Sequence, residues 1–270
     1  ELEETNRGVL ALYAELDEKA ASLKRANETK TSFLSNMTHE FRTPLNSIIG
    51  LARAALSGED GELHSEHKKQ ITYIEKSAEA LSVLVNDLLD IAKVEAGRIE
   101  VHPNHFDLRD VLSGLRGVFK PFAASHPDIN LIFDIPTDAL EAQTDEGKVT
   151  QILRNLISNA LKYTKSGEIR VSVQARQDDT LMFSVSDTGI GIAPEDRERI
   201  FDEFIQVESP IQRAHKGTGL GLSLSRKLAV LLKGTLSVES VLERGSVFTF
   251  IIPRHYVVIA EVQKQGVEIQ

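Results

Sequence analysis

Apolar residues recur with helical spacing through the first fifth of the chain. A seven-residue repeat, typical of a coiled-coil seam, opens the sequence at Leu2, Val9, Leu16 and Leu23. A second stripe starts at Leu34 and advances in steps of three and four residues. The pattern predicts one long helix over residues 1–56, of which residues 1–30 form a coiled-coil signalling helix.

A polar break and a second helical stripe follow. Residues 57–61 combine serine, glycine and acidic residues, which interrupt a helix. Regular three- and four-residue spacing then predicts a helix over residues 65–96, closed by Gly97 in the C′ position. The apolar stripe of such a hairpin is too long for one hairpin to bury. We therefore predict a homodimer, with residues 31–100 forming a four-helix bundle.

The pattern changes after Gly97. Alternating apolar and polar positions predict strands at residues 129–135, 168–174, 181–186, 235–239 and 246–252. Helical patterns lie between them at residues 108–125, 146–163 and 220–232. This mixture predicts an α+β sandwich with helices on one sheet face, over residues 101–255. Residues 97–107 form the expected linker, and residues 256–270 are expected to be a tail or a further linker.

Composition narrows the class of protein. Of 270 residues, 41% are apolar and none is cysteine, so a folded core is feasible while disulfides and thiolate metal sites are excluded. A net charge of −9 without a basic block argues against nucleic acid as a partner. No apolar run reaches the roughly 18 residues of a membrane span. Because the sequence begins at Glu1 rather than Met, we expect it to be excised from a longer protein, in which a sensor or membrane anchor could lie upstream. The absence of cysteine favours a reducing compartment, and we expect a cytoplasmic location.

The first motif whose residues could carry out a reaction lies in the first helix, around His39. This histidine lies off the apolar stripe, and an exposed imidazole is largely neutral near pH 7, so it can act as a nucleophile. Glu40 can reach the Nδ1 side of the ring, which leaves Nε2 to attack. Thr43 lies one turn further along the same face. Taken alone, the motif is more typical of an ordinary surface histidine.

The second motif is a polar stripe on the helix predicted at residues 146–163. Asn155, Asn159 and Lys162 share one face of that helix, and apolar residues occupy the other. Amide oxygens are hard ligands suited to Mg²⁺, and an ammonium group suits phosphate. A merely solvated helix face is the alternative interpretation.

Two glycine-rich motifs complete the set. The sequence Asp-Thr-Gly-Ile-Gly-Ile at residues 187–192 allows a backbone to approach a flat ligand, and the Asp187 carboxylate can accept a hydrogen bond from an adenine amine. The sequence Lys-Gly-Thr-Gly-Leu-Gly-Leu-Ser at residues 216–223 opens a helix, where backbone N–H groups favour anions. A tight turn or an ordinary glycine loop would explain either motif alone.

In this order, the motifs resemble the H, N, G1, F and G2 boxes of sensor histidine kinases, with residues 200–204 resembling the F-box. The resemblance covers about residues 30–255. It implies a helical-hairpin dimerisation domain followed by an ATP-binding domain of the GHKL or Bergerat type. No Walker A motif or Ser/Thr kinase motif set occurs.

The resemblance also implies residue roles. His39 would be the phosphoacceptor, Glu40 its acid/base partner, and Thr43 the residue that holds water during dephosphorylation of a regulator. Asn159 would bind Mg²⁺. The ATP-binding set would be Asn155, Asn159, Lys162, Tyr163, Asp187, Gly189, Gly191, Ile192, Lys216, Gly217, Thr218, Gly219, Leu220, Gly221 and Leu222. Residues 205–216 would form a lid, with Gln212, Arg213, His215 and Lys216 in reach of phosphate.

The function implied is ATP- and Mg²⁺-dependent autophosphorylation of His39, followed by transfer to an aspartate of a response-regulator receiver domain. Phosphatase activity toward that regulator would accompany it in some members. Two alternatives remain at this point. One is a GHKL-type ATPase without phosphotransfer, and the other is a degenerate dimeric scaffold that signals by docking.

Overall fold

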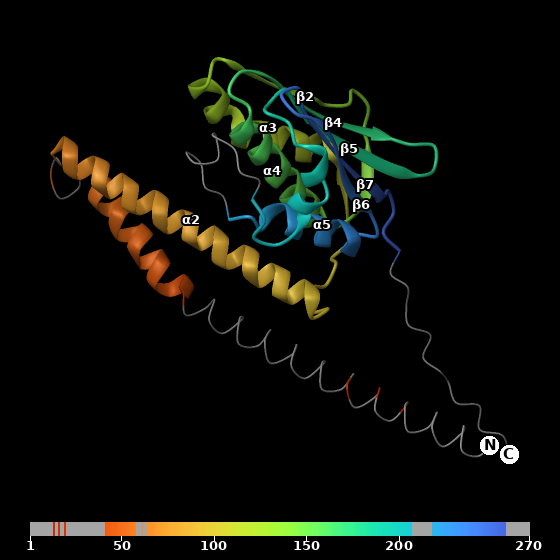
Figure 1. Ribbon diagram of the computed structural model, residues 1–270, viewed down its shortest axis with the longest axis horizontal. Helices are drawn as coiled ribbons and strands as arrows, with labels where there is room; N and C mark the ends of the chain where they lie inside the picture. Colours follow the sequence, from red (N-terminus) through yellow and green to blue (C-terminus); the bar gives the residue numbers. More distant parts are fainter. Residues whose placement is uncertain are drawn as a thin grey trace. The chain divides into compact units, whose positions relative to one another are not determined.

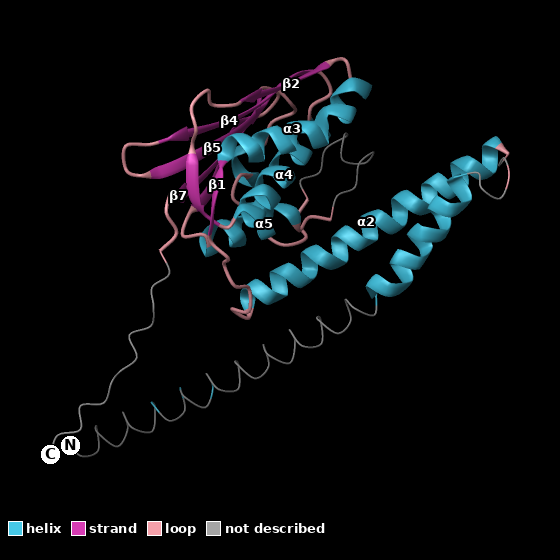
Figure 2. Cartoon of the chain, turned by 180° about the vertical axis from the view of Figure 1, so that it is seen from behind, coloured by secondary structure: helices cyan, strands magenta, loops and turns pink. Residues whose placement is uncertain are grey.

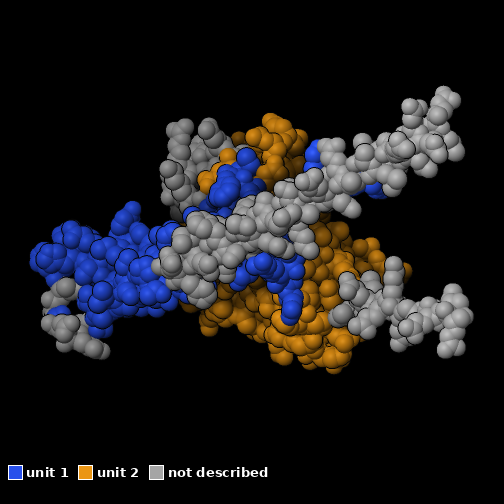
Figure 3. Space-filling model, turned by 90° about the horizontal axis from the view of Figure 1, so that it is seen from below, with its two compact units in different colours: residues 1–100, 203–205, 218–224 blue, residues 101–202, 206–217, 225–270 orange. Residues whose placement is uncertain are grey.

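The computed structural model describes residues 13, 16, 19, 41–57, 61, 64–206 and 218–257. These residues fall into two compact units (Figure 3). The first comprises residues 1–100, 203–205 and 218–224, and the second comprises the remainder. The predicted coiled-coil seam lies almost wholly outside the described residues. His39 and Glu40 also lie outside them.

The first unit contains a helical hairpin. Residues 41–57 are helical, and helix α2 (Ser65–Glu95) returns beside them (Figure 1). Arg42 Nη2 donates to Asn86 Oδ1 at 3.0 Å, whereas Arg53 donates to Glu75 at 2.9 Å and Glu79 at 2.6 Å. The earlier residue of the first helix, Arg42, thus contacts the later part of α2, and the later residue, Arg53, contacts the earlier part. The two helices are therefore antiparallel, as the hairpin prediction requires.

Gly97 ends helix α2 as the sequence predicts. Its φ of +64° is left-handed, which glycine adopts without a steric penalty. The Gly97 N–H donates to Val94 O at 3.0 Å, and the Arg98 N–H donates to Lys93 O at 2.9 Å. These bonds satisfy carbonyl groups that the last helical turn would otherwise leave unpaired.

The second unit is built on a five-stranded sheet with the order β2-β4-β5-β7-β6. Its strands are β2 (Ile129–Asp134), β4 (Gly167–Ala175), β5 (Thr180–Asp187), β6 (Thr235–Val241) and β7 (Gly245–Pro253). Strand β2 is parallel to β4, and the other pairs are antiparallel. Each of the five strands overlaps its predicted position.

Three helices lie on one face of this sheet (Figures 1 and 2). They are α3 (Leu108–Ser125), α4 (Glu146–Tyr163) and α5 (Gly221–Leu231). Alternate residues of β5 and β7 are buried, and the rings of Phe183 and Phe250 stack 5.3 Å apart. The architecture is the predicted α+β sandwich.

A small second sheet was not predicted. Strand β1 (Asn104–Asp107) pairs antiparallel with β3 (Glu141–Thr144). Both strands are short, and β1 begins with two exposed residues, so neither shows the apolar alternation that identifies a strand. The expectation that residues 97–107 form a linker throughout is therefore wrong for its last four residues.

Two 3-10 turns, η1 (Pro194–Asp196) and η2 (Arg199–Phe201), follow strand β5. Arg226 of α5 lies 4.6 Å from the centre of the Phe201 ring and donates to Glu198 at 3.1 Å. These contacts attach the predicted F-box to helix α5.

Candidate nucleotide-binding site

Helix α4 is anchored at its amino end by Asp145. This carboxylate accepts hydrogen bonds from the Lys148 N–H at 3.0 Å and from the His102 N–H at 3.0 Å, and it pairs with Lys148 Nζ at 2.5 Å. Burial alone would raise the pKa of Asp145, but the hydrogen bonds outweigh it and hold the pKa below its ordinary value. Asp145 therefore remains ionised and joins the chain entering the domain to α4.

Asn104 strengthens this anchor. Its side-chain nitrogen donates to Glu146 at 3.2 Å, and its side-chain oxygen accepts from the Glu146 N–H at 3.4 Å. Sequence reasoning assigned no role to Asp145, Lys148 or His102. An aspartate directly before a helical pattern is a recognisable cap signal, whereas the His102 contact spans 43 residues and has no local signature.

The polar and apolar faces of α4 separate as predicted. Ile152, Leu153, Leu156, Ile157 and Ala160 are all buried. Asn155, Asn159 and Lys162 are instead half-buried along one face. The Asn155 amide nitrogen donates to the Ser225 hydroxyl of α5 at 2.8 Å. This hydrogen bond uses the amide nitrogen and fixes the orientation of the side chain. The carbonyl oxygen of Asn155 therefore remains available to a ligand.

The carboxyl end of α4 meets the end of strand β5. Lys162 Nζ lies 4.9 Å from the centre of the Tyr163 ring. The Tyr163 carbonyl accepts the Ile190 N–H at 3.3 Å. A Cβ atom on Gly189 would lie 2.5 Å from that same carbonyl and 2.9 Å from Asp187 Oδ1. Close packing at Gly189 thus brings the end of α4 beside the Asp187 turn.

Asp187 is largely buried at this turn and accepts the Gly189 N–H at 2.8 Å. Burial raises its pKa above the ordinary range, although hydrogen bonds from the Gly189 and Ser246 backbones oppose the rise. A carboxylate that is costly to ionise gains from a further donor. An exocyclic amine of a purine is such a donor.

Gly191 and Ile192 fix the rest of the turn. Gly191 has a φ of +65°, and a Cβ atom there would lie 2.1 Å from the Val241 carbonyl oxygen. The Ile192 N–H donates to the Ser240 hydroxyl at 2.8 Å. The turn is therefore held against strand β6, and only glycine fits at position 191.

The described part of the second glycine motif also forms an ordered turn. The Thr218 hydroxyl accepts the Leu220 N–H at 3.2 Å, and Leu220 is fully buried. Gly219 has a φ of +73°, and its carbonyl accepts the Phe204 N–H at 3.0 Å. Gly221 and Leu222 begin α5. Lys216 and Gly217 lie outside the described residues, as do Gln212, Arg213 and His215.

Of the predicted catalytic set, the structure describes only Thr43. It lies on the exposed side of the first hairpin helix, and its carbonyl accepts the Ser47 hydroxyl at 3.1 Å. Within the described segments, no helix has both the length and the apolar character required to cross a bilayer.

Two family models match the chain. The His Kinase A (phospho-acceptor) domain matches residues 29–97. The histidine kinase-, DNA gyrase B- and HSP90-like ATPase matches residues 144–256. The fold and the site thus define a phosphoacceptor domain joined to an ATPase domain.

Individual relatives agree with this assignment. The autoinducer 2 sensor kinase/phosphatase LuxQ of Vibrio vulnificus strain YJ016 is 36% identical over 247 residues, 87% of this chain and 28% of its own length. The aerobic respiration control sensor protein ArcB of Escherichia coli K12 is 38% identical over 235 residues, 86% of this chain and 29% of its own length. The chain belongs to the sensor histidine kinases, and it spans less than a third of either relative.

Solved structures show the same fold. Full-length ShkA in complex with AMPPNP has a TM-score of 0.67 and 33% identity, covering 83% of this chain and 46% of its own. The histidine kinase ThkA in complex with the response regulator TrrA has a TM-score of 0.58 and 26% identity, covering 86% of this chain and 65% of its own. The GHKL-type sheet domain predicted from the sequence is confirmed.

Proposed function

We propose that this chain transfers the γ-phosphoryl group of ATP to His39 and passes it on to an aspartate of a response regulator. The observation that supports this most directly is the polar face of α4, which leads from Asn155 and Asn159 to Lys162 and ends beside Asp187. One continuous surface thus offers groups suited to a metal, to phosphate and to adenine. The AMPPNP complex of ShkA supports ATP as the nucleotide.

In this proposal each residue has a defined task. Asp187 accepts a hydrogen bond from the adenine amine, and the absence of a side chain at Gly189 and Gly191 lets the base approach the backbone. Asn159 supplies an amide oxygen to Mg²⁺, and Lys162 neutralises phosphate charge. When bound, Mg²⁺ would neutralise further charge on the phosphates. The donor set fits that ion because its oxygens are hard ligands.

The phosphoryl step is a substitution at phosphorus. His39 Nε2 forms a bond to the γ-phosphorus while the bond from that phosphorus to the bridging oxygen breaks, and ADP leaves. Glu40 accepts a hydrogen bond from the imidazole Nδ1–H and takes up that proton as the ring becomes positively charged. Catalysis is then mainly positioning and charge stabilisation. The phosphoramidate formed is a reactive donor for a regulator aspartate, and ThkA in complex with TrrA supports such a partner.

Labelling with γ-labelled ATP tests the kinase proposal. Wild-type protein should acquire acid-labile, base-stable label, and His39→Gln should acquire none while still binding nucleotide. Asn159→Ala should lose most labelling with its fold intact, whereas Ser158→Ala, on the neighbouring exposed position, should label normally. ATP hydrolysis without any phosphoprotein would favour the GHKL-ATPase alternative. A protein that binds no nucleotide would favour the scaffold alternative.

Phosphatase activity is proposed for the same helix face. Thr43 lies one turn from His39 in sequence, so its hydroxyl can hold a water in line with a regulator acyl phosphate. Thr43→Ala should keep labelling within about tenfold, or 1.4 kcal/mol of barrier, and lose most dephosphorylation. Decay of the phosphorylated regulator at the wild-type rate would withdraw this role.

We also propose that the hairpin forms a homodimer. Ile74 and Leu81 of α2 are each 48% exposed, and on a helical projection both lie on the side that carries the buried Ala78 and Ala92. Packing two hairpins through this side would complete a four-helix bundle.

A further inference from the structure

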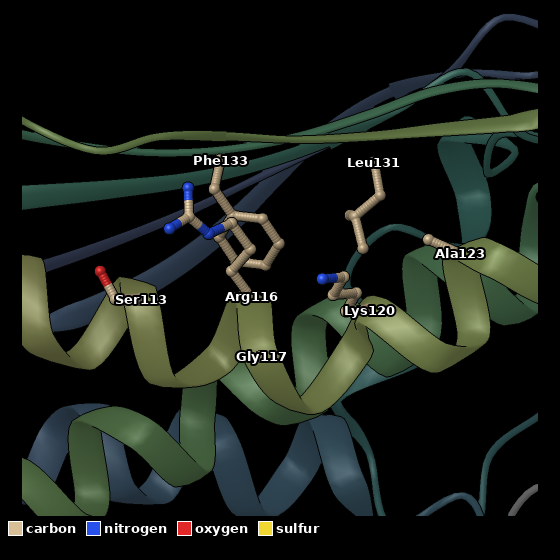
Figure 4. Close-up of a pocket in the computed structure, with 7 residues that line it drawn as sticks. All are labelled: Ser113, Arg116, Gly117, Lys120, Ala123, Leu131 and Phe133. Carbon is tan, nitrogen blue, oxygen red and sulfur yellow. The ribbon is translucent and has the colours of Figure 1, made fainter.

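A groove separate from the nucleotide site lies between helix α3 and strand β2 (Figure 4). Leu131 and Phe133 of β2 form its apolar floor, and Arg116 and Lys120 of α3 rise toward them. Neither cation forms an ion pair with any residue in the described part of the chain. None of the groove residues belongs to the histidine kinase motifs.

Small residues keep the groove open. Gly117, Ala123 and Ser113 form its helical wall. A Cβ atom added to Gly117 would meet nothing within 4 Å. A glycine in the middle of an exposed helix costs about 1 kcal/mol relative to alanine. Local stability therefore does not explain the glycine, and the missing side chain leaves the apolar floor accessible.

The groove adjoins an open sheet edge. Strand β2 is one of the two edge strands of the sheet, and no described strand pairs with its free side. Its Ile129 is in register with Gly167 of β4, and the Gly167 N–H donates to Asp128 O at 2.9 Å. In a parallel ladder alternate residues face alternate neighbours, so Leu131 directs its backbone N–H and C=O away from the sheet.

We propose that this groove binds an extended acidic polypeptide strand, which pairs with the free edge of β2. The strand edge requires a partner with backbone donors and acceptors, which selects a polypeptide over a lipid or a nucleic acid. The two unpaired cations select acidic side chains, and the Leu131–Phe133 floor selects apolar residues at alternate positions. Asp134, the nearest acidic side chain on β2, is neutralised by Arg170 at 2.9 Å.

A labelled peptide of alternating glutamate and valine, seven residues long, is the probe. It should bind the intact chain, and the same peptide with lysine for glutamate should bind at least tenfold more weakly. Methylating alternate backbone nitrogens should abolish binding, because the peptide can then no longer pair with β2. Equal binding by the methylated peptide would overturn the proposal, as would no binding at millimolar peptide.

Matched variants locate the site. Gly117→Leu should block binding without unfolding the helix, whereas Gly114→Leu should not, because position 114 is also open but does not line the groove. Lys120→Glu should weaken binding at least tenfold, and Arg176→Glu, with the same charge change elsewhere, less than twofold. All four variants should keep nucleotide binding. The proposal would be overturned if Gly114→Leu and Arg176→Glu lost peptide binding while the two groove variants kept it. Gly117-dependent self-association without peptide binding would also overturn it, in favour of a second copy as the occupant.

Discussion

The sheet domain and the helical hairpin differ in how completely they bury their apolar side chains. The sheet domain buries complete side chains such as Phe183, Phe250 and Leu153, each at most 1% exposed. In the described part of the helical hairpin few residues are buried, three of them alanines (Ala52, Ala78 and Ala92), while many larger apolar residues such as Leu51, Ile74 and Leu81 are exposed. The sheet domain therefore has a complete core of its own, whereas the described part of the hairpin exposes an apolar face, which is the face proposed for the dimer.

This difference predicts different sensitivities. Substitutions on the exposed apolar face of the hairpin should weaken dimerisation, which depends on protein concentration. Substitutions in the sheet domain should instead lower the stability or the nucleotide affinity of the single chain. The five predictions below test this distinction, in order of decreasing effect.

A charge on the open hairpin face should have the largest effect. Leu81→Asp places a carboxylate in the proposed bundle core twice per dimer, and should weaken dimerisation by at least about 4 kcal/mol because buried unpaired charges are costly. Val83→Asp is the control, since Val83 is 55% exposed but points away from that face. Sedimentation velocity measures both. Equal effects of the two variants, or a monomeric wild type, would remove the contrast between the units.

Removing the α4 anchor should follow in size. Asp145→Ala deletes a helix cap and leaves the Lys148 ammonium buried, which should cost the sheet domain about 3 kcal/mol. Adding Lys148→Met should recover part of that loss, because the unpaired charge disappears. Thermal unfolding of the variants measures this. If Asp145→Ala melts like the wild type, the anchor contributes nothing.

The same residue predicts a pH dependence. Because the folded-state pKa of Asp145 lies below the unfolded value of about 3.9, its stabilisation is complete above that value. It is lost as pH falls through the folded pKa. The wild type should therefore lose more stability than Asp145→Ala as pH falls below about 4.

A methyl group at Gly191 should have a smaller, local effect. Gly191→Ala combines a left-handed backbone with a contact of 2.1 Å to the Val241 carbonyl, and should cost about 2 kcal/mol. Nucleotide affinity should fall as the turn shifts. Gly50→Ala in the hairpin, where a Cβ meets nothing within 4 Å, should leave nucleotide affinity unchanged. Titration with a fluorescent nucleotide distinguishes the two variants.

Protonation of Asp187 should give the smallest effect. Burial raises its folded pKa, so in the free protein the ionisation of Asp187 lowers stability as pH rises from the unfolded pKa of about 3.9 to the folded pKa. A donor from adenine favours the ionised form. Nucleotide affinity should therefore rise a few-fold with pH through this pKa and then level off. Asp187→Asn should lack this component when the two pH profiles are compared, and parallel profiles would exclude Asp187 as the titrating group.

The sequence anticipated elements whose signals are local. The bounds of α3 and α4 match their predicted ranges, because Asp107 and Asp145 cap them and the apolar spacing stops where each helix ends. The polar face of α4 followed from spacing alone. Strands β1 and β3 were missed because each is stabilised by pairing with the other, and the paired residues are far apart in the sequence, from Asp107 with Glu141 to Asn104 with Thr144. The His102–Asp145 bond and the α3–β2 groove likewise depend on tertiary proximity, which periodicity does not report.

The hydrogen bond from Phe204 to Gly219 has a consequence for how this family can diversify. It joins the two ends of the intervening segment, so the flanking elements are held at a separation that does not depend on the segment's length. For two chain positions that are held together, doubling the number of residues between them adds only about 0.6 kcal/mol to the entropic cost of closure. An insertion or deletion between these two residues should therefore leave the contact from Phe204 to Gly219, and the elements that flank it, in place. Relatives can differ in the number of residues at this point while the rest of the domain keeps its architecture.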